Sequence, residues 1–173
     1  EDVEDAAVDR FMDLLSRAQN MSKATLWYEI GRDNVRTFSQ VYPSFFKGKT
    51  LYTFLASMYD VHVEVVKMVA GAKPPILEMK PISSHEAIFS YDSPRGMQDY
   101  FRGLIQGAVE FFHEPLSMDV LEQTPTHLKL KLHFAALICA EQTFPINRAL
   151  SFIGSVAGKI SLVSFTVTLI PAF

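Results

Sequence analysis

A seven-residue stretch near residue 130 constrains the fold more than any other part of the chain. From Leu128 to Phe134 apolar and polar side chains alternate strictly, in the order Leu, Lys, Leu, Lys, Leu, His, Phe. Because successive side chains of a strand point to opposite faces of a sheet, this spacing predicts a strand with one wet face. The run Leu116–Leu121 precedes it, so the two predict an antiparallel pair.

The rest of the sequence predicts helices and a second pair of strands. Helical spacing begins in the stretch from Val8 to Leu15, and prolines in the segment Gly71–Pro75 stop a later helix because they cannot continue the hydrogen-bond ladder. Gly103 and Gly107 lie four apart on one helical face, where a neighbour can approach closely. The order of elements predicts an α+β domain, in which a helical part and further helices pack with an antiparallel sheet. The remaining segments are helices over Met21–Val41, Thr50–Ala70 and Met97–Phe112, and strands over Ile76–Ile82 and Ala87–Tyr91.

Composition and charge exclude several classes of protein. The net charge of −3 gives no basic surface for phosphate backbones, so we expect no nucleic-acid partner. A single cysteine, Cys139, excludes an internal disulfide framework and a cysteine-cluster metal site. The 14 Phe and 7 Met residues suit either an ordinary large core or the wall of a pocket for a flat hydrophobic ligand.

The residues at both ends of the sequence allow predictions about what adjoins this domain. The chain starts at Glu1 with an acidic stretch, which predicts an internal start rather than a signal peptide. Residues 149–173 are almost wholly apolar, with Lys159 the only charge, and they exceed the ~20 residues that cross a bilayer. A central lysine would cost about 2.5–3.5 kcal/mol there. We therefore keep two alternatives for this segment, the start of a transmembrane region and a buried pair of strands.

One histidine interrupts an apolar helical stripe. In the helix predicted over Thr50–Ala70 the stripe runs Leu51, Leu55, Met58, His62, Val65, Val69, so His62 falls on the buried face. An ordinary explanation is a neutral core histidine bonded to a backbone carbonyl. The alternative is an axial ligand to a metal held in an apolar pocket.

Two further polar residues fall on apolar helical faces. Asn34 shares a face with Trp27, Ile30, Phe38 and Val41, and a buried Asn must be hydrogen-bonded. Tyr100 shares a stripe with Leu104, Ala108 and Phe111, where an amphipathic core tyrosine is common. Either residue can be structural, or can serve a pocket.

A trio of polar side chains follows the second predicted strand. Tyr91, Ser93 and Arg95 alternate, so an extended backbone would aim two hydroxyls and a guanidinium to one side. Such a group suits carboxylates or phosphates, because Arg offers a planar fork of donors. The ordinary alternative is a helix start with Ser93 as its N-cap and Arg95 in a surface ion pair.

Taken together, these residues resemble the H-NOX family, the haem-nitric oxide/oxygen binding domains, over about residues 1–134. Tyr91, Ser93 and Arg95 match the family's Y-x-S-x-R motif, which binds the haem propionates. The family's proximal histidine precedes a Gly-Ala-x-Pro-Pro segment, which identifies His62, and Pro75 matches the proline that presses on the porphyrin. The segment from Gly31 to Phe38 resembles the distal helix of oxygen-binding members, and Tyr100 matches their distal tyrosine.

The resemblance implies a haem-based sensor of O2 and NO, with CO as a further ligand, that is not an enzyme. His62 would bind the iron of haem b, and Tyr100 would donate a hydrogen bond to bound dioxygen while Asn34 holds its phenol. We expect Phe38 and Leu104 to line the gas pocket. Signals would pass through the helix of His62 to a fused or partner output module, such as a chemotaxis receptor signalling domain.

The resemblance also predicts how the chain is divided. Residues 1–135 would form an H-NOX-like domain lacking its N-terminal helices, 136–148 a linker, and 149–173 the apolar segment. We expect a cytoplasmic sensor domain, anchored at the inner membrane if that segment crosses it. An alternative function is a truncated module of the same fold that binds no haem and serves in protein interaction or lipid binding. A haem peroxidase is disfavoured because no distal His–Arg pair can be identified.

Overall fold

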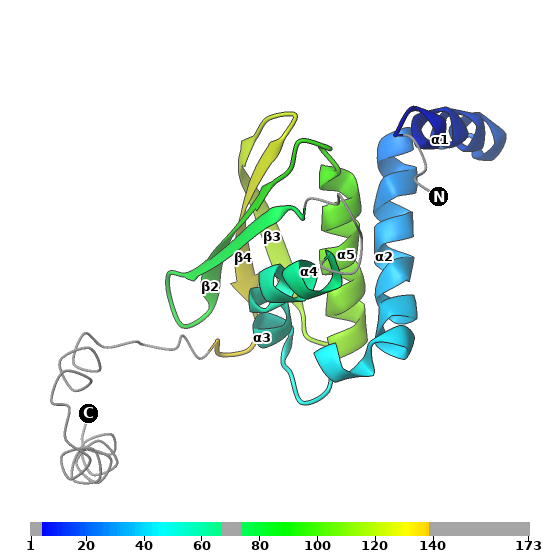
Figure 1. Cartoon of the computed structure of the whole chain (residues 1–173). Coiled ribbons are helices and arrows are strands. Elements are labelled where there is room, and N and C mark those ends of the chain that lie inside the picture. Colours follow the sequence, from blue (N-terminus) through cyan, green and yellow to red (C-terminus); the bar gives the residue numbers. More distant parts are fainter. Residues whose placement is uncertain (1–4, 67–73, 139–173) are drawn as a thin grey trace, which may run out of the picture. The chain divides into compact units, whose positions relative to one another are not determined.

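The computed structural model describes residues 5–66 and 74–138, which form helices packed on one antiparallel sheet (Figure 1). This arrangement confirms the predicted α+β class. The helices are α1 (Asp5–Gln19), α2 (Lys23–Val41), the short 3-10 turn η1 (Pro43–Phe45), α3 (Leu51–Ala56), α4 (Met58–Val66) and α5 (Gln98–Phe112). The strands are β1 (Ile76–Pro81), β2 (Glu86–Asp92), β3 (Leu116–Gln123) and β4 (His127–Phe134).

The sheet has the order β1-β2-β4-β3, with all neighbours antiparallel. The alternation predicted for β4 is confirmed, since its leucines and Phe134 are buried while the intervening lysines and histidines are only partly so. Strand β2 alternates in the same way and buries Ala87, Phe89 and Tyr91. Burial of these side chains supplies the main driving force for the sheet to pack against helices on that face.

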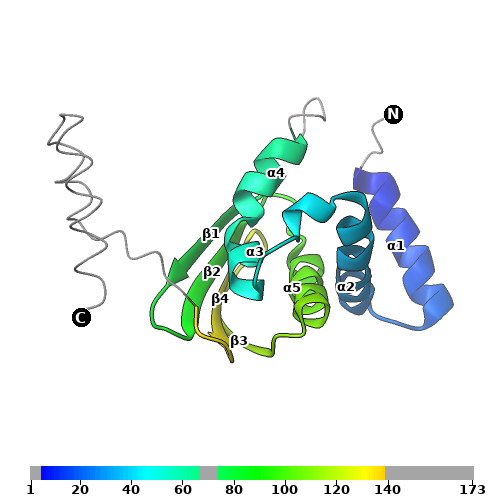
Figure 2. The same cartoon turned by 90° about the horizontal axis from the view of Figure 1, so that it is seen from below.

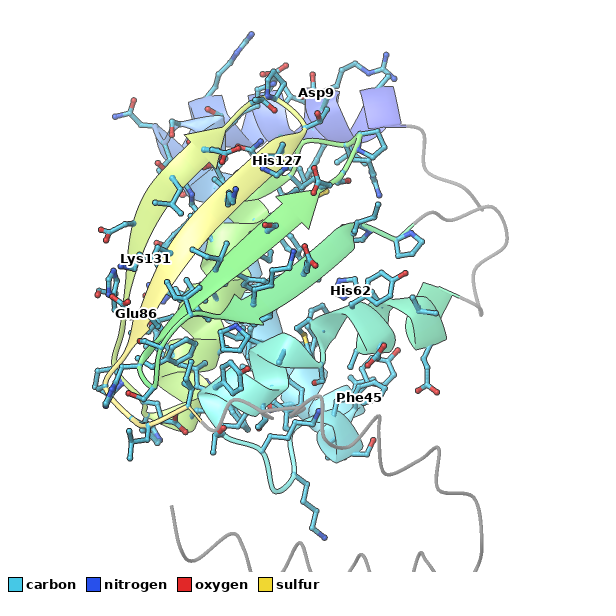
Figure 3. All side chains as sticks on the ribbon, turned by 90° about the vertical axis from the view of Figure 1, so that its left-hand side faces the viewer. Asp9, Phe45, His62, Glu86, His127 and Lys131 are labelled. Atoms are coloured by element: carbon cyan, nitrogen blue, oxygen red, sulfur yellow. The ribbon has the colours of Figure 1, made fainter. Side chains whose placement is uncertain are left out.

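The opposite face of the sheet carries paired charges. Lys131 and His133 of β4 both contact Glu86 of β2, at 2.8 Å and 3.0 Å. Figure 3 shows Glu86 and Lys131 side by side on this outer face. Ion pairs at a solvent-accessible surface such as this contribute little to stability. The face therefore satisfies its polar groups without forming part of the interior.

Helices α2 and α5 lie side by side and touch backbone to backbone (Figures 1 and 2). A Cβ on Gly103 of α5 would lie 2.0 Å from the Tyr28 carbonyl oxygen, and one on Gly31 of α2 would lie 2.2 Å from the Tyr100 carbonyl oxygen. Gly107 meets the Arg32 carbonyl oxygen in the same way, at 2.3 Å. The close approach expected at Gly103 and Gly107 is thus confirmed, and it fixes how the two helices are aligned.

The single helix predicted over Thr50–Ala70 is wrong in one respect, because the chain breaks it at Ser57 into α3 and α4. The Ser57 hydroxyl donates to the Phe54 carbonyl oxygen at 2.8 Å and accepts a hydrogen bond from Lys49 Nζ at 2.5 Å. A serine that bonds back to the preceding turn bends a helix. The apolar stripe continues across the bend, so its spacing does not reveal the break.

Several expectations fall partly or wholly outside the described residues. These are the end of the predicted second helix, most of the Gly71–Pro75 stop, nearly all of the predicted linker 136–148, and the apolar segment 149–173 with both of its alternatives. Within residues 5–66 and 74–138, no helix combines the length and the apolar character needed to cross a membrane.

Candidate functional site

A pocket of about 280 Å³ opens between the inner face of the sheet and the helices. Its volume is close to the lower end of the range for small-molecule sites, ~300–1,000 Å³. Most of its wall is apolar and aromatic, as expected for a site that takes a flat hydrophobic ligand. The lining residues are Val35, Phe38, Tyr42, Phe45, Phe46, Phe54, Leu55, Met58, Val61, His62, Pro75, Leu77, Phe89, Tyr91, Ser93, Arg95, Met97, Tyr100, Phe101, Leu104 and Ile105.

His62 projects from α4 into this pocket, on the side of the helix that faces β1 (Figure 3). Its Nδ1 lies 2.7 Å from the Met58 carbonyl oxygen, one turn earlier in the same helix. Because a carbonyl oxygen only accepts, Nδ1 carries the proton and donates it. In the neutral ring Nε2 then carries the lone pair, and it is the ring nitrogen that could bind a metal.

The bond to Met58 also satisfies the ordinary explanation, in which His62 is a core histidine bonded to a backbone carbonyl. That explanation and metal binding are compatible, because the carbonyl uses Nδ1 and a metal would use Nε2. His62 lies in the pocket wall and is only partly buried, and this position favours metal binding over a purely structural role.

Tyr91, Ser93 and Arg95 meet at the pocket, where β2 ends and the loop to α5 begins. Tyr91 and Ser93 are buried, whereas Arg95 is exposed. Ser93 Oγ accepts a hydrogen bond from the Arg95 backbone N–H at 3.3 Å. The alternative in which Ser93 caps a helix is wrong, because α5 begins at Gln98 with Met97 at its N-cap position.

Tyr100 of α5 reaches the pocket beside α2. The Asn34 side-chain amide donates to the Tyr100 hydroxyl oxygen at 3.1 Å, and Asn34 itself stands behind the pocket wall. The Trp27 ring meets the Tyr100 ring edge-on, with centroids 6.1 Å apart. Burial raises the pKa of the Tyr100 phenol, and the Asn34 bond opposes this only in part. The phenol is therefore neutral at physiological pH and can donate a hydrogen bond.

The remaining residues expected at the site also line the pocket. Pro75 and Leu104 contribute to its wall, and Phe38 does so from a rim position where 38% of its surface is exposed. Phe101 stacks on Tyr91 with centroids 4.8 Å apart, which joins α5 to the sheet beneath the pocket. All the residues predicted for the site thus line the pocket except Asn34, which bonds to Tyr100 from behind the wall, while their roles toward a ligand stay predictions.

One buried polar residue of this region was not identified from the sequence. Gln98 opens α5 and is 5% exposed, and its side-chain amide bonds to the turn between β3 and β4. A signal was present, because Gln98 is three residues before Phe101 and seven before Ile105, on the apolar stripe of α5.

The donor groups indicate what kind of metal complex would fit. Among the described residues, no group of three or more His, Cys, Asp or Glu side chains is placed to hold a bare ion. An apolar pocket with one imidazole and an arginine at its edge fits a flat metal macrocycle that carries carboxylates, and haem is such a group.

Comparison with known proteins agrees with this geometry. Residues 1–120 match the family model HNOB, described as haem-NO-binding. Among solved structures, a Cs H-NOX mutant is 37% identical, with a TM-score of 0.76 over 80% of this chain and 77% of that one. A point mutant of the H-NOX domain of T. tengcongensis is also 37% identical, with a TM-score of 0.75 over 80% of this chain and 78% of that one.

A third solved structure is described as an oxygen-binding H-NOX domain related to soluble guanylate cyclases, in an oxygen complex. It is 35% identical to this chain, with a TM-score of 0.75 over 83% of this chain and 78% of that one. No curated protein matches the chain significantly. The family model and these structures each cover most of the chain, and so the protein belongs to the H-NOX family of haem-NO-binding domains, a family of haem-based gas sensors.

Proposed function

We propose that this chain is a haem-based sensor of O2 and NO that signals without catalysing a reaction. The observation that carries the proposal is one apolar pocket with the His62 imidazole on one wall and the Tyr100 phenol, held by Asn34, on another. The oxygen complex of a 35% identical domain supports it. Haem b, when bound, would supply the iron that takes up the gas.

The residues around the pocket would divide the work of holding haem. His62 Nε2 would bind the iron, and its bond to Met58 would keep the ring oriented. Tyr91, Ser93 and Arg95 would pair with the two carboxylates, which are costly to hold beside apolar walls without donors. Pro75, on the pocket wall next to β1, would press on the macrocycle.

Selection between gases would rest on Tyr100. Bound dioxygen carries partial negative charge, so a neutral phenol that donates a hydrogen bond would stabilise it. The Asn34 amide occupies the acceptor side of that phenol and leaves its proton to point elsewhere. NO and CO need no such donor, and they would bind with little help from Tyr100.

The signal would leave the pocket through α4. A change in the pull on His62, or in the pressure on Pro75, would displace α4 relative to the sheet and bias a two-state element. The receiving module would be fused to this domain or would bind it, as in a chemotaxis receptor. The resemblance to the H-NOX family supports this step.

The test is an absorption spectrum of the chain after addition of haem, with His62→Ala beside it. We expect a Soret band in the native chain, which His62→Ala abolishes or shifts. His85→Ala is the matched control, because His85 lies exposed in the β1–β2 turn, and its spectrum should equal that of the native chain.

Two outcomes would contradict the proposal. A native chain that stays colourless with ample haem would favour the alternative of a non-haem interaction or lipid-binding module. A spectrum of His62→Ala that equals the native one would show that another group holds the iron.

A further inference from the structure

We propose that Gln98 is a positioning residue for the carboxylates of the ligand, acting through the turn between β3 and β4. This inference rests on the proposed function, in which Ser93 and Arg95 bind haem propionates. Gln98 itself is not among the residues that line the pocket. It ties together two loops, and one of these carries the carboxylate-binding residues.

The side chain of Gln98 is buried, and its Nε2 donates to the carbonyl oxygens of Thr124 and, at 3.1 Å, His127. Both hydrogens of the amide are therefore used on the backbone at the two ends of one turn. The Thr124 N–H also donates to the His127 carbonyl oxygen at 2.8 Å, so a backbone bond closes the turn as well. Gln98 therefore attaches both ends of this turn to the start of α5.

The same turn contacts the loop that follows β2. The Thr126 carbonyl oxygen accepts a hydrogen bond from the Ser93 backbone N–H at 2.9 Å. The Pro125 carbonyl oxygen lies 2.5 Å from where a Cβ on Gly96 would stand, and Gly96 has a φ of +61°. The turn thus holds the loop at Ser93 and at Gly96, on either side of Arg95.

Two further backbone bonds lie within the loop itself. The Gly96 N–H donates to the Ser93 carbonyl oxygen at 3.1 Å, and the Gln98 N–H donates to the Gly96 carbonyl oxygen at 3.0 Å. Next to the turn, His127 Nδ1 lies 2.6 Å from Asp92 Oδ1, at the end of the strands in Figure 3. Backbone bonds therefore hold the loop at Ser93, Gly96 and Gln98, and the Asp92 side chain is bonded at its start.

This rigidity matters because Arg95 is exposed. A long, exposed side chain loses conformational entropy when it binds a carboxylate, and a mobile backbone would add to that loss. A loop that is already held in place before the ligand binds avoids the loss of backbone entropy. Gln98 therefore sets how tightly the carboxylates are held without contacting them.

The experiment measures how fast haem leaves the chain, by transfer to excess apomyoglobin, for haem b and for its dimethyl ester. The ester has the same macrocycle but no carboxylates. We expect Gln98→Leu to raise the dissociation rate of haem b about tenfold and that of the ester by less than ~2-fold. Gln106→Leu is the matched control on the same helix, where Nε2 donates to Glu110 Oε1 at 3.1 Å, and it should change neither rate.

Gly96→Ala is a second variant, which displaces the same turn from the opposite side in case Gln98→Leu folds poorly. It should show the same selectivity for haem b. Equal acceleration of haem b and the ester would mean that Gln98 acts only through general stability, and this would overturn the proposal, as would an unchanged haem b rate. A native chain without a Soret band would instead refute the proposed function.

Discussion

Two walls of the pocket are built very differently. Helices α2 and α5 touch through glycine backbones at Gly31, Gly103 and Gly107, and the wall they form carries Tyr100, to which Asn34 donates from behind the wall. Helix α4 carries His62, begins directly after the bend at Ser57, and among the described residues makes its main contacts with α3 and β1. The wall formed by α2 and α5 is therefore closely packed, whereas the wall formed by α4 is a short helix that follows a bend.

The difference teaches where a signal can arise. Backbone contacts through glycines leave little freedom for α2 to slide along α5, so Tyr100 keeps its place. Motion is easier where few packed contacts have to break, and among the described residues α4 packs less extensively than α5 does. Under the proposed function, the group that recognises the gas is therefore on the rigid wall and the group that reports it is on the adaptable one.

Hydrogen exchange in the haem-free chain tests this contrast most strongly. We expect α4 amides to exchange through local opening that costs at least ~3 kcal/mol less than opening of α5, since local openings range from about zero to the global stability of ~5–15 kcal/mol. Exchange of α5 should rise steeply with sub-denaturing urea, and exchange of α4 should barely respond. Equal urea dependence of the two helices would break the comparison.

The rigid wall can be broken at Gly103. Gly103→Ala places a Cβ 2.0 Å from the Tyr28 carbonyl oxygen, so we expect it to lower the free energy of unfolding by about 2 kcal/mol. Alanine would otherwise stabilise a helix interior by about 1 kcal/mol over glycine. The measurement is urea unfolding, with Thr37→Ala on the exposed side of α2 as the control, which should be neutral or slightly stabilising. An increase in stability of Gly103→Ala would show that the helices can move apart freely.

The function of the rigid wall can be tested at Tyr100. Tyr100→Phe removes a hydrogen bond to a partly charged ligand, worth roughly 1.5–3 kcal/mol, so O2 affinity of the haem-loaded chain should fall about tenfold or more. NO affinity should change little. Gas titrations would measure both, and Tyr28→Phe, on α2 but away from the pocket wall, should leave both unchanged. Equal losses for O2 and NO would remove Tyr100 from its proposed role.

The smallest effect concerns pH. The pKa of Tyr100 in the folded chain is raised above its ordinary value of 10.0, chiefly by burial. The unfolded chain then releases this proton first, so its contribution to stability is complete below pH 10 and is lost as pH rises through the folded pKa. Tyr100→Phe should therefore lose less stability above pH 10 than the native chain, as followed by thermal unfolding. Identical pH profiles would show that the phenol is well solvated.

Most elements of the fold are visible in the sequence because burial imposes a period. The alternation from Leu128 to Phe134 predicts β4, and the stripe through Tyr100 and Leu104 predicts α5, within a residue or two of the observed bounds. The bend at Ser57 was not predicted because it depends on the Ser57 hydroxyl and on Lys49, whereas the apolar period continues through it unchanged.

The site follows a similar rule. His62 and Asn34 stood out because each interrupts an apolar stripe, and the structure places His62 in the pocket and Asn34 against Tyr100. Gln98 interrupts a stripe too, but its partners are backbone carbonyls of a distant turn, which no side-chain pattern identifies. A motif names the groups that touch a ligand more readily than those that hold them in place.

Trp27 gives the protein an optical reporter of its own pocket. It is the only tryptophan in the chain, and its ring meets the edge of the Tyr100 ring on the rigid wall. Haem absorbs light where tryptophan emits, so a macrocycle seated beside Tyr100 would quench this fluorescence. Loading and release of the ligand can therefore be followed by intrinsic emission, without a label and without altering any residue of the site.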